Sequence, residues 1–194
     1  LGQLRPTFLV VVPRVLQKIQ AAAGAKAAEK GLGKVWSSAQ RTAIDWGDFR
    51  ETASAGARAP LGLRVRHGAF DKLFFSRLRQ VMGGRVTHVL SGGATLDADL
   101  SRFFGGIGVP VIEGYGLTET TAPLTGNLPS DIRSGTVGRP LPGSTVRISD
   151  DGEILARGIG VFSGYRNPEH NADAFVDGFF RTGDLGRLDE QGRV

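Results

Sequence analysis

Cysteine is absent from this 194-residue sequence, and so is any long apolar run. The lack of cysteine excludes disulfide bonds and thiolate metal sites, and it fits a reducing compartment. The longest apolar run, residues 8–12, has the length of a strand, whereas a membrane-spanning helix needs ~20 residues. No secretory signal peptide is visible either. We therefore expect a cytoplasmic protein.

Histidine is scarce, with 3 residues, and no histidine–carboxylate constellation is visible. Glycine is abundant instead: its 29 residues amount to about twice the usual ~7%. This excess favours a chain rich in turns and in loops that face a ligand. A hydrophobic content of 40% is ordinary for a globular protein and excludes a disordered chain.

Acidic residues are scarce in the first half of the chain. Residues 1–90 contain 15 lysines and arginines against 5 acidic residues, a net charge of +10, whereas residues 91–194 contain 9 against 14, a net charge of −5. A basic half is compatible with nucleic acid, an anionic membrane surface or a plain solvated face. The arginines are scattered and no aromatic-rich RNA-binding signature accompanies them, so we expect no nucleic-acid partner.

The first 128 residues alternate between strand and helix patterns. Residues 7–12 predict a strand, Pro13 suits the first turn of a helix, and the alanine-rich residues 21–59 predict helices or, alternatively, an exposed excursion. The alternation continues with a helix expected at residues 70–81, a strand at residues 86–90, a helix at residues 96–104 and a strand at residues 109–112. This alternation predicts parallel β-sheet units.

The helix at residues 70–81 combines an apolar face with Lys72, Arg77 and Arg79. Such a basic amphipathic helix either packs on the core or lies on a membrane surface. We expect core packing and keep peripheral membrane contact as the alternative.

The pattern changes near Pro129. Residues 145–149 and 153–156 flank an Asp-Gly turn and predict a hairpin. Further strands are expected at residues 161–165 and 179–188, and a short helix at residues 168–175. The fold class is therefore α/β: residues 1–128 form a partial parallel sheet flanked by helices, and residues 129–194 a small, mostly antiparallel, barrel-like subdomain.

The string Tyr115-Gly116-Leu117-Thr118-Glu119-Thr120 follows the strand at residues 109–112. In open α/β sheets, ligands bind at the carboxyl ends of strands. Glycines on both sides of Tyr115 allow a sharp turn and a close ligand approach. The threonine hydroxyl can reach a phosphate oxygen, and an ionised carboxylate holds Mg²⁺ well beside phosphates and water. The string therefore indicates an adenylate and magnesium site.

Two further strings support a nucleotide site. Arg181-Thr182-Gly183-Asp184-Leu185-Gly186 presents Asp184 on a glycine turn, where its carboxylate either accepts both ribose hydroxyls or forms an Asx turn. Ser91-Gly92-Gly93-Ala94 follows a strand, and its glycine pair makes a flat backbone wall beside a planar ligand.

In this order, the three strings resemble the adenylate-forming superfamily of acyl-CoA synthetases, peptide-synthetase adenylation domains and beetle luciferases. The chain looks most like a long-chain fatty-acid–CoA ligase. This resemblance rests on Arg5-Pro6-Thr7-Phe8, Val12-Pro13-Arg14-Val15, the helical residues 21–59, the string from Gly152-Glu153-Ile154 to Gly158, and Gly164-Tyr165-Arg166-Asn167-Pro168-Glu169. The resemblance implies two half-reactions: ATP and a fatty acid give an acyl-adenylate and pyrophosphate, and the thiol of CoA then displaces AMP.

The resemblance also implies a role for single residues. Tyr115 would stack on adenine, Thr118 would contact the α-phosphate, Glu119 would bind Mg²⁺, and Asp184 would hold the ribose. The purine walls would be Gly93, Ala94, Glu113 and Gly114, and the residues bordering the acyl carboxylate would be Gly116, Leu117 and Ala122.

The family's phosphate loop ending in Pro-Lys-Gly, its hinge and its C-terminal lysine do not occur in the sequence. We therefore expect an internal piece of a larger synthetase that does not catalyse adenylation alone. A fatty-acyl-AMP ligase or another adenylating enzyme is the close alternative. A nucleotide-binding or interaction module without turnover is the alternative of a different class.

Overall fold

The computed structural model describes residues 3–54 and 56–194, which form two compact units. The first unit comprises Leu1–Ile112 and Pro129–Gly135, and the second comprises Glu113–Leu128 and Thr136–Val194. The string at residues 115–120 thus belongs to the second unit. The subdomain boundary expected from the sequence lies at residue 129.

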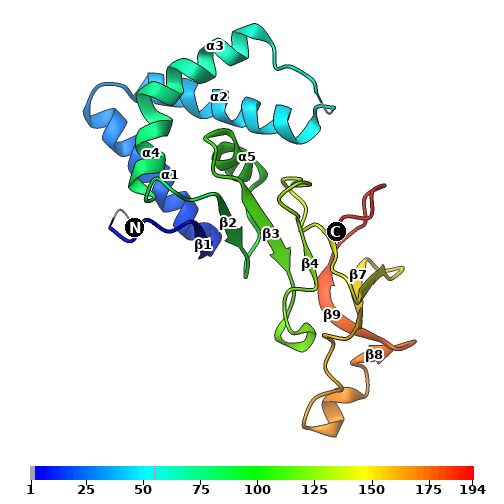
Figure 1. The fold of residues 1–194 in the computed structure, drawn as a ribbon. Coiled ribbons are helices and arrows are strands. Elements are labelled where there is room, and N and C mark those ends of the chain that lie inside the picture. Colours follow the sequence, from blue (N-terminus) through cyan, green and yellow to red (C-terminus); the bar gives the residue numbers. More distant parts are fainter. Residues whose placement is uncertain (1–2, 55) are drawn as a thin grey trace. The chain divides into compact units, whose positions relative to one another are not determined.

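The first unit is a layer of helices on a short parallel strand pair (Figure 1). Strands β1 (Phe8–Val11) and β2 (His88–Ser91) pair in parallel register, with Phe8 opposite His88. The helices are α1 (Pro13–Glu29), α2 (Gly33–Thr52), α3 (Leu61–Phe70), α4 (Ser76–Val81) and α5 (Ala98–Gly106). The strand at residues 7–12 and the helix start at Pro13 are confirmed.

The helix expected at residues 70–81 is longer than its apolar spacing indicates. It begins at Leu61, directly after Pro60, and a π-helical turn at Asp71–Phe75 joins α3 to α4. The Arg79 guanidinium donates to Asp71 at 2.6 Å and to the Ile107 carbonyl at 2.7 Å. Phe75 and Leu78 are buried, so core packing is the observed arrangement for this helix.

Helices α2 and α5 pack closely because small residues line the seam. On α2, Trp36, Ala39, Ala43 and Gly47 recur every three or four residues and are buried. A Cβ atom on Gly106 would lie 1.8 Å from the Ala43 carbonyl oxygen, and one on Gly47 would lie 2.2 Å from that of Arg102. The backbones thus touch where glycine leaves room, and Phe103 and Phe104 of α5 are fully buried in the core.

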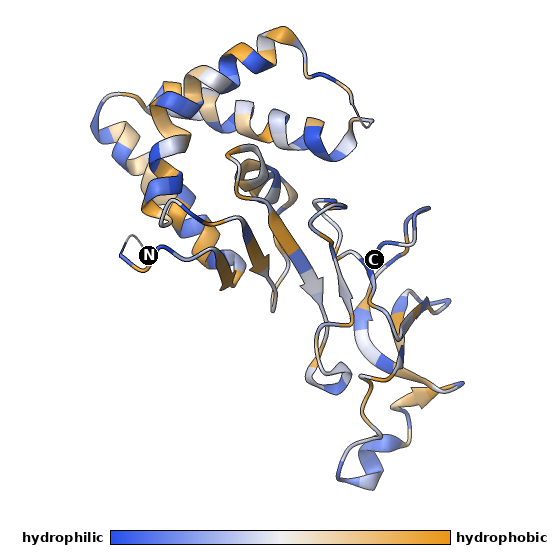
Figure 2. Ribbon diagram, viewed as in Figure 1, coloured by the Kyte–Doolittle hydropathy of each residue, from blue (hydrophilic) through white to orange (hydrophobic). Residues whose placement is uncertain are grey.

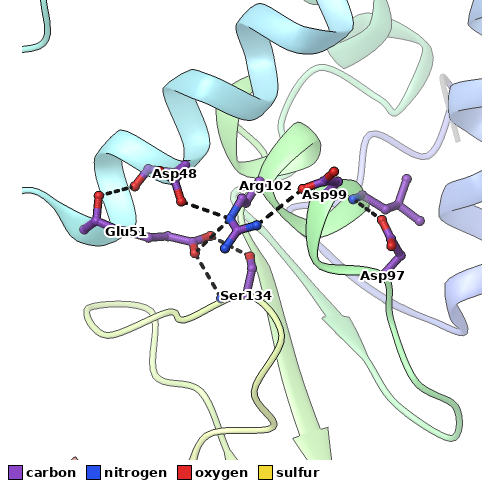
Figure 3. Close-up of polar contacts among 8 residues, drawn as sticks. Asp48, Glu51, Asp97, Asp99, Arg102 and Ser134 are labelled. Atoms are coloured by element: carbon purple, nitrogen blue, oxygen red, sulfur yellow. Dashed lines mark hydrogen bonds and ion pairs between the residues drawn. The ribbon is translucent and has the colours of Figure 1, made fainter.

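Arg102 on α5 joins the ends of these helices (Figure 3). Its guanidinium lies 3.3 Å from Asp48 of α2 and 3.3 Å from Asp99 of its own helix. Glu51 of α2 in turn accepts from the Ser134 backbone at 3.0 Å and from its hydroxyl at 2.6 Å. These contacts explain why Pro129–Gly135 belongs to the first unit.

The second unit is mostly antiparallel. Strand β3 (Val111–Tyr115) enters it and pairs with β4 (Thr125–Gly126), which pairs with β5 (Arg139–Pro140). A four-stranded sheet has the order β6-β7-β9-β8. Its strands are β6 (Ser144–Ile148), β7 (Glu153–Gly158), β8 (Phe175–Val176) and β9 (Phe179–Leu185).

The fold class expected from the sequence is confirmed: a mixed sheet flanked by helices, whose strands run in the order β1-β2-β3-β4-β5, is accompanied by the antiparallel sheet. Figure 2 shows β2 and the start of β3 as apolar, as expected for strands that helices cover. Among residues 3–54 and 56–194, no helix is both long and apolar enough to cross a membrane.

Three expectations for the second unit are corrected in part. Residues 161–165 form no strand, because their backbone binds a loop instead of a neighbouring strand. The last strand ends at Leu185 instead of residue 188, and the short helix is a single 3₁₀ turn at Pro168–Asn171. The hairpin around Gly152 is confirmed, with Val146 opposite Ala156.

Candidate functional site

The loop that follows β3, residues 116–122, is closed by its own hydrogen bonds. The buried Thr120 hydroxyl accepts from the Leu117 N–H at 2.9 Å and donates to the Leu117 carbonyl at 3.1 Å. A Cβ atom on Gly116 would lie 2.8 Å from the Leu124 nitrogen, so only glycine fits where the loop returns. The turn leaves Thr118 and Ala122 exposed and Leu117 and Glu119 half-buried.

Tyr115 and Asp184, 69 residues apart in sequence, meet in the second unit. The Tyr115 hydroxyl donates to Asp184 Oδ2 at 2.7 Å. No aromatic ring among the described residues stacks on the half-buried Tyr115, whereas Tyr165, the other tyrosine, packs edge-on against Phe162. The hydrogen bond fixes the phenol at its edge, which is compatible with stacking of a planar ligand on the ring.

The turn before Asp184 is fixed by a buried carboxylate to which sequence analysis gave no role. Glu153 on β7 is 6% exposed and accepts from Arg181 Nε at 2.8 Å and from the Gly183 N–H at 2.9 Å. The Thr182 hydroxyl donates to the Ile154 carbonyl at 2.7 Å and accepts from the Asp184 N–H at 3.2 Å. The sequence feature that points to Glu153 is its position, as an acidic residue, directly before the apolar run Ile154-Leu155-Ala156.

Glu119 is paired with the other tyrosine. The Tyr165 hydroxyl donates to Glu119 Oε1 at 3.1 Å. Among residues 3–54 and 56–194, no group of three or more histidines, cysteines, aspartates and glutamates could hold a metal ion. Glu119 is thus a single carboxylate on a loop, and not part of a preformed metal cage.

The remaining residues of the predicted site lie in different surroundings. Glu113 is buried in β3, and its carbonyl accepts from the Asn127 N–H at 2.8 Å. Gly114 pairs with Gly126 in the ladder to β4. Gly93 and Ala94 are exposed after β2 in the first unit, and Gly93 has a positive φ of 78°. The second unit therefore contains Tyr115, Thr118, Glu119 and Asp184, and the glycine wall belongs to the first unit.

Both tyrosines are expected to resist ionisation. Burial and the nearby Asp184 carboxylate raise the pKa of Tyr115 above its ordinary value of 10.0, and loss of solvation with the hydrogen bond to Glu119 raises the pKa of Tyr165. At pH 10.5, absorbance at 295 nm should show less tyrosinate in the native protein than in urea. Because both folded pKa values are raised, their contribution to stability is complete below pH 10 and is lost above it. Superimposable native and unfolded titration curves would contradict this prediction.

Comparison with known proteins identifies the family of this chain. A family model described as AMP-binding enzyme matches residues 1–166. The chain therefore belongs to the AMP-binding enzyme family, as its motifs suggested.

Named relatives agree with this family. The chain is 44% identical to the long-chain-fatty-acid–CoA ligase FadD15 of Mycobacterium bovis, over 99% of this chain and 32% of that protein. It is 32% identical to the long chain acyl-CoA synthetase 4 of Arabidopsis thaliana, over 100% of this chain and 30% of that protein. The chain thus spans about a third of the length of these curated relatives.

Solved structures support the same fold. The o-succinylbenzoate coenzyme A synthetase MenE of Bacillus subtilis in complex with AMP matches with a TM-score of 0.52 and 29% identity, over 62% of this chain and 28% of that one. A Mycobacterium tuberculosis fatty acyl CoA synthetase matches with a TM-score of 0.52 and 27% identity, over 64% of this chain and 28% of that one.

Proposed function

We propose that this chain is the adenylate-binding part of an ATP-dependent long-chain fatty-acid–CoA ligase. The reaction joins ATP and a fatty acid into an acyl-adenylate, and the thiol of CoA then displaces AMP. The hydrogen bond between Tyr115 and Asp184 carries the proposal, because it joins an aromatic side chain to a carboxylate. A base and its ribose diol need these two groups side by side. The names of the relatives support the fatty-acid substrate and the CoA acceptor.

Each remaining site residue has a role in this proposal. Thr118 is exposed, so its hydroxyl is free to donate to an α-phosphate oxygen. Gly116, Leu117 and Ala122 border the acyl carboxylate on the same loop. Glu113 and Gly114, in the same unit as Tyr115, form a wall of the purine site. A fatty acid is already an anion at neutral pH, so positioning and charge neutralisation supply the catalysis and no general base is needed.

Magnesium fits the donor set at Glu119. Mg²⁺ usually keeps several waters and binds proteins through one or two carboxylates plus substrate phosphates. A single loop carboxylate beside an exposed threonine matches that pattern, and the absence of a three-residue cluster among the described residues is compatible with it. The ion would neutralise charge on the phosphates, and Glu119 would orient it.

The test uses the full-length gene product that contains this chain. Fatty-acid-dependent exchange between ATP and pyrophosphate reports the first half-reaction, and AMP release with formation of the acyl-CoA thioester reports the second. Exchange without thioester formation would favour a fatty-acyl-AMP ligase. Nucleotide binding without exchange would favour an interaction module. We expect residues 1–194 alone not to catalyse exchange at a useful rate, because the family's Pro-Lys-Gly phosphate loop does not occur among them.

A surface on α3 supports contact with an anionic membrane, where fatty acids partition. Leu61 is 72% exposed and Val65 is 63% exposed, and their spacing of four residues puts both on one helix face. The exposed residues Arg58, Arg64 and Arg66 flank them, and residues 52–70 include no acidic side chain. A surface pocket of about 560 Å³ beside them is lined partly by Trp46, Phe49 and Arg50. Charge and exposed apolar area together suit a lipid surface.

We expect the double change Leu61→Ser and Val65→Ser to weaken binding to phosphatidylglycerol vesicles about tenfold, because apolar burial contributes ~0.8 kcal/mol per methylene. Arg64→Glu should have a similar effect at low salt. Vesicle co-sedimentation measures both. Val81→Ser is the matched control, since Val81 is 65% exposed at the end of α4. Equal binding by the double variant and Val81→Ser would contradict a docking role for α3.

A further inference from the structure

Both tyrosines of the chain donate their hydroxyls to carboxylates of the proposed site. Tyr115 donates to Asp184, and Tyr165, 46 residues beyond Glu119, donates to Glu119 Oε1 at 3.1 Å. Tyr165 lies outside the strings that define the site, in a segment that the sequence assigned to a strand. Its contact with Glu119 raises the question of what the phenol does there.

The backbone of Tyr165 is fixed from both sides by one side chain. The Tyr165 N–H donates to Asn171 Oδ1 at 2.7 Å, and Asn171 Nδ2 donates to the Tyr165 carbonyl at 2.9 Å. The preceding Gly164 has a φ of +139°, and a Cβ atom there would lie 2.8 Å from Asn171 Oδ1. The ring packs edge-on against Phe162 with centroids 4.8 Å apart. The position of the hydroxyl is therefore set before any ligand arrives.

The segment that contains Tyr165 is also bound to the loop that contains Glu119. The Phe162 N–H donates to the Glu119 carbonyl at 2.8 Å. The Thr121 hydroxyl donates to the Gly160 carbonyl at 2.7 Å. The hydrogen bond between the Tyr165 hydroxyl and Glu119 is therefore the third contact between these two segments. Together these contacts preorganise the carboxylate, because its rotamer is restricted without cost at the moment of binding.

We infer that Tyr165 is a positioning residue that orients the Glu119 carboxylate for the nucleotide-bound metal ion. Donation to Oε1 leaves Oε2 to face a cation, and Mg²⁺ requires near-ideal octahedral geometry. The inference deepens the proposed function and rests on the metal role of Glu119. Asn171 supports the positioning of Glu119 indirectly, because it fixes the backbone of Tyr165.

The experiment compares Tyr165→Phe, Glu119→Gln and the double variant in the full-length gene product. Phenylalanine removes the hydroxyl and keeps the ring that packs on Phe162, and thermal unfolding checks the fold. Two readouts are used: the Mg²⁺ concentration for half-maximal exchange, and Mn²⁺ affinity by electron paramagnetic resonance with a non-hydrolysable ATP analogue. For Tyr165→Phe we expect metal affinity to fall about fivefold, with the KM for ATP at saturating metal unchanged. In the Glu119→Gln background, the same change should have no further effect.

The outcomes separate the inference from the function on which it rests. If Glu119→Gln weakens the metal but Tyr165→Phe does not, the positioning role of Tyr165 is overturned and the proposed function stands. If Tyr165→Phe has the same effect with and without Glu119, the phenol acts independently, and the inference is also overturned. If Glu119→Gln leaves Mn²⁺ affinity unchanged, the metal role of Glu119 fails and the inference fails with it. Should Tyr165→Phe unfold, Asn171→Ala replaces it, with the same expected loss of metal affinity.

Discussion

Asp184→Ala is expected to weaken the binding of a non-hydrolysable acyl-adenylate mimic by about 100-fold. A hydrogen bond to a charged group contributes ~1.5–3 kcal/mol, and a carboxylate that accepts both ribose hydroxyls makes two of them. Each 1.4 kcal/mol is roughly a factor of ten in affinity. The variant also removes the acceptor of the Tyr115 hydroxyl, so the aromatic face loses its anchor. Isothermal titration calorimetry on the full-length gene product measures the change.

Two companion variants separate the contributions to this effect. Tyr115→Ala removes the stacking face and should also weaken binding strongly, whereas Tyr115→Phe removes only the hydroxyl and should cost less. Asp150→Ala is the matched control, because Asp150 is an exposed aspartate of the β6–β7 turn. Wild-type affinity in both Asp184→Ala and Tyr115→Ala would show that the nucleotide binds elsewhere.

Gly106→Ala is expected to destabilise the first unit by about 3 kcal/mol, the upper part of the range for overpacked cores. The new Cβ atom would lie 1.8 Å from the Ala43 carbonyl oxygen and 2.6 Å from its carbon. These neighbours are backbone atoms of α2, so relief requires the two helices to separate. The urea concentration at the midpoint of unfolding measures the loss.

The adjacent glycine is the control for this prediction. A Cβ atom on Gly105 would meet nothing within 4 Å, so Gly105→Ala relieves the entropic cost of glycine in α5 without a clash. We expect it to leave stability unchanged or to raise it by ~0.5–1 kcal/mol. Equal midpoints for the two variants would mean that α2 and α5 do not pack as closely as described.

The helical half of the fold was predictable because its signals are local. Pro13 marks the start of α1, and the Asp97 side chain accepts from the Leu100 N–H at the start of α5. Leu100, Phe103 and Phe104 are buried, as their helical spacing indicated. Local hydrogen bonding and apolar periodicity are sufficient to predict such helices without knowledge of the rest of the fold.

Residues 161–165 show where local signals fail. Val161, Phe162 and Tyr165 have strand propensity, yet the segment forms no strand because Phe162 donates its N–H to Glu119. Strand assignment depends on a partner strand, and this partner was a loop about 40 residues away. The same limitation hid Glu153, whose role depends on Arg181 and the Gly183 N–H on another strand.

The sequence by itself determined the family and the candidate site residues, because an aromatic ring, a threonine, a glutamate and a distant aspartate occur in the order that the family's motifs have. Only the tertiary structure decided how those groups are paired: Tyr115 with Asp184, Glu119 with Tyr165, and Glu153 with the Gly183 N–H. Short-range order follows from propensity and turn chemistry, whereas contacts over 28 to 69 residues depend on which strands and loops the packed core brings together.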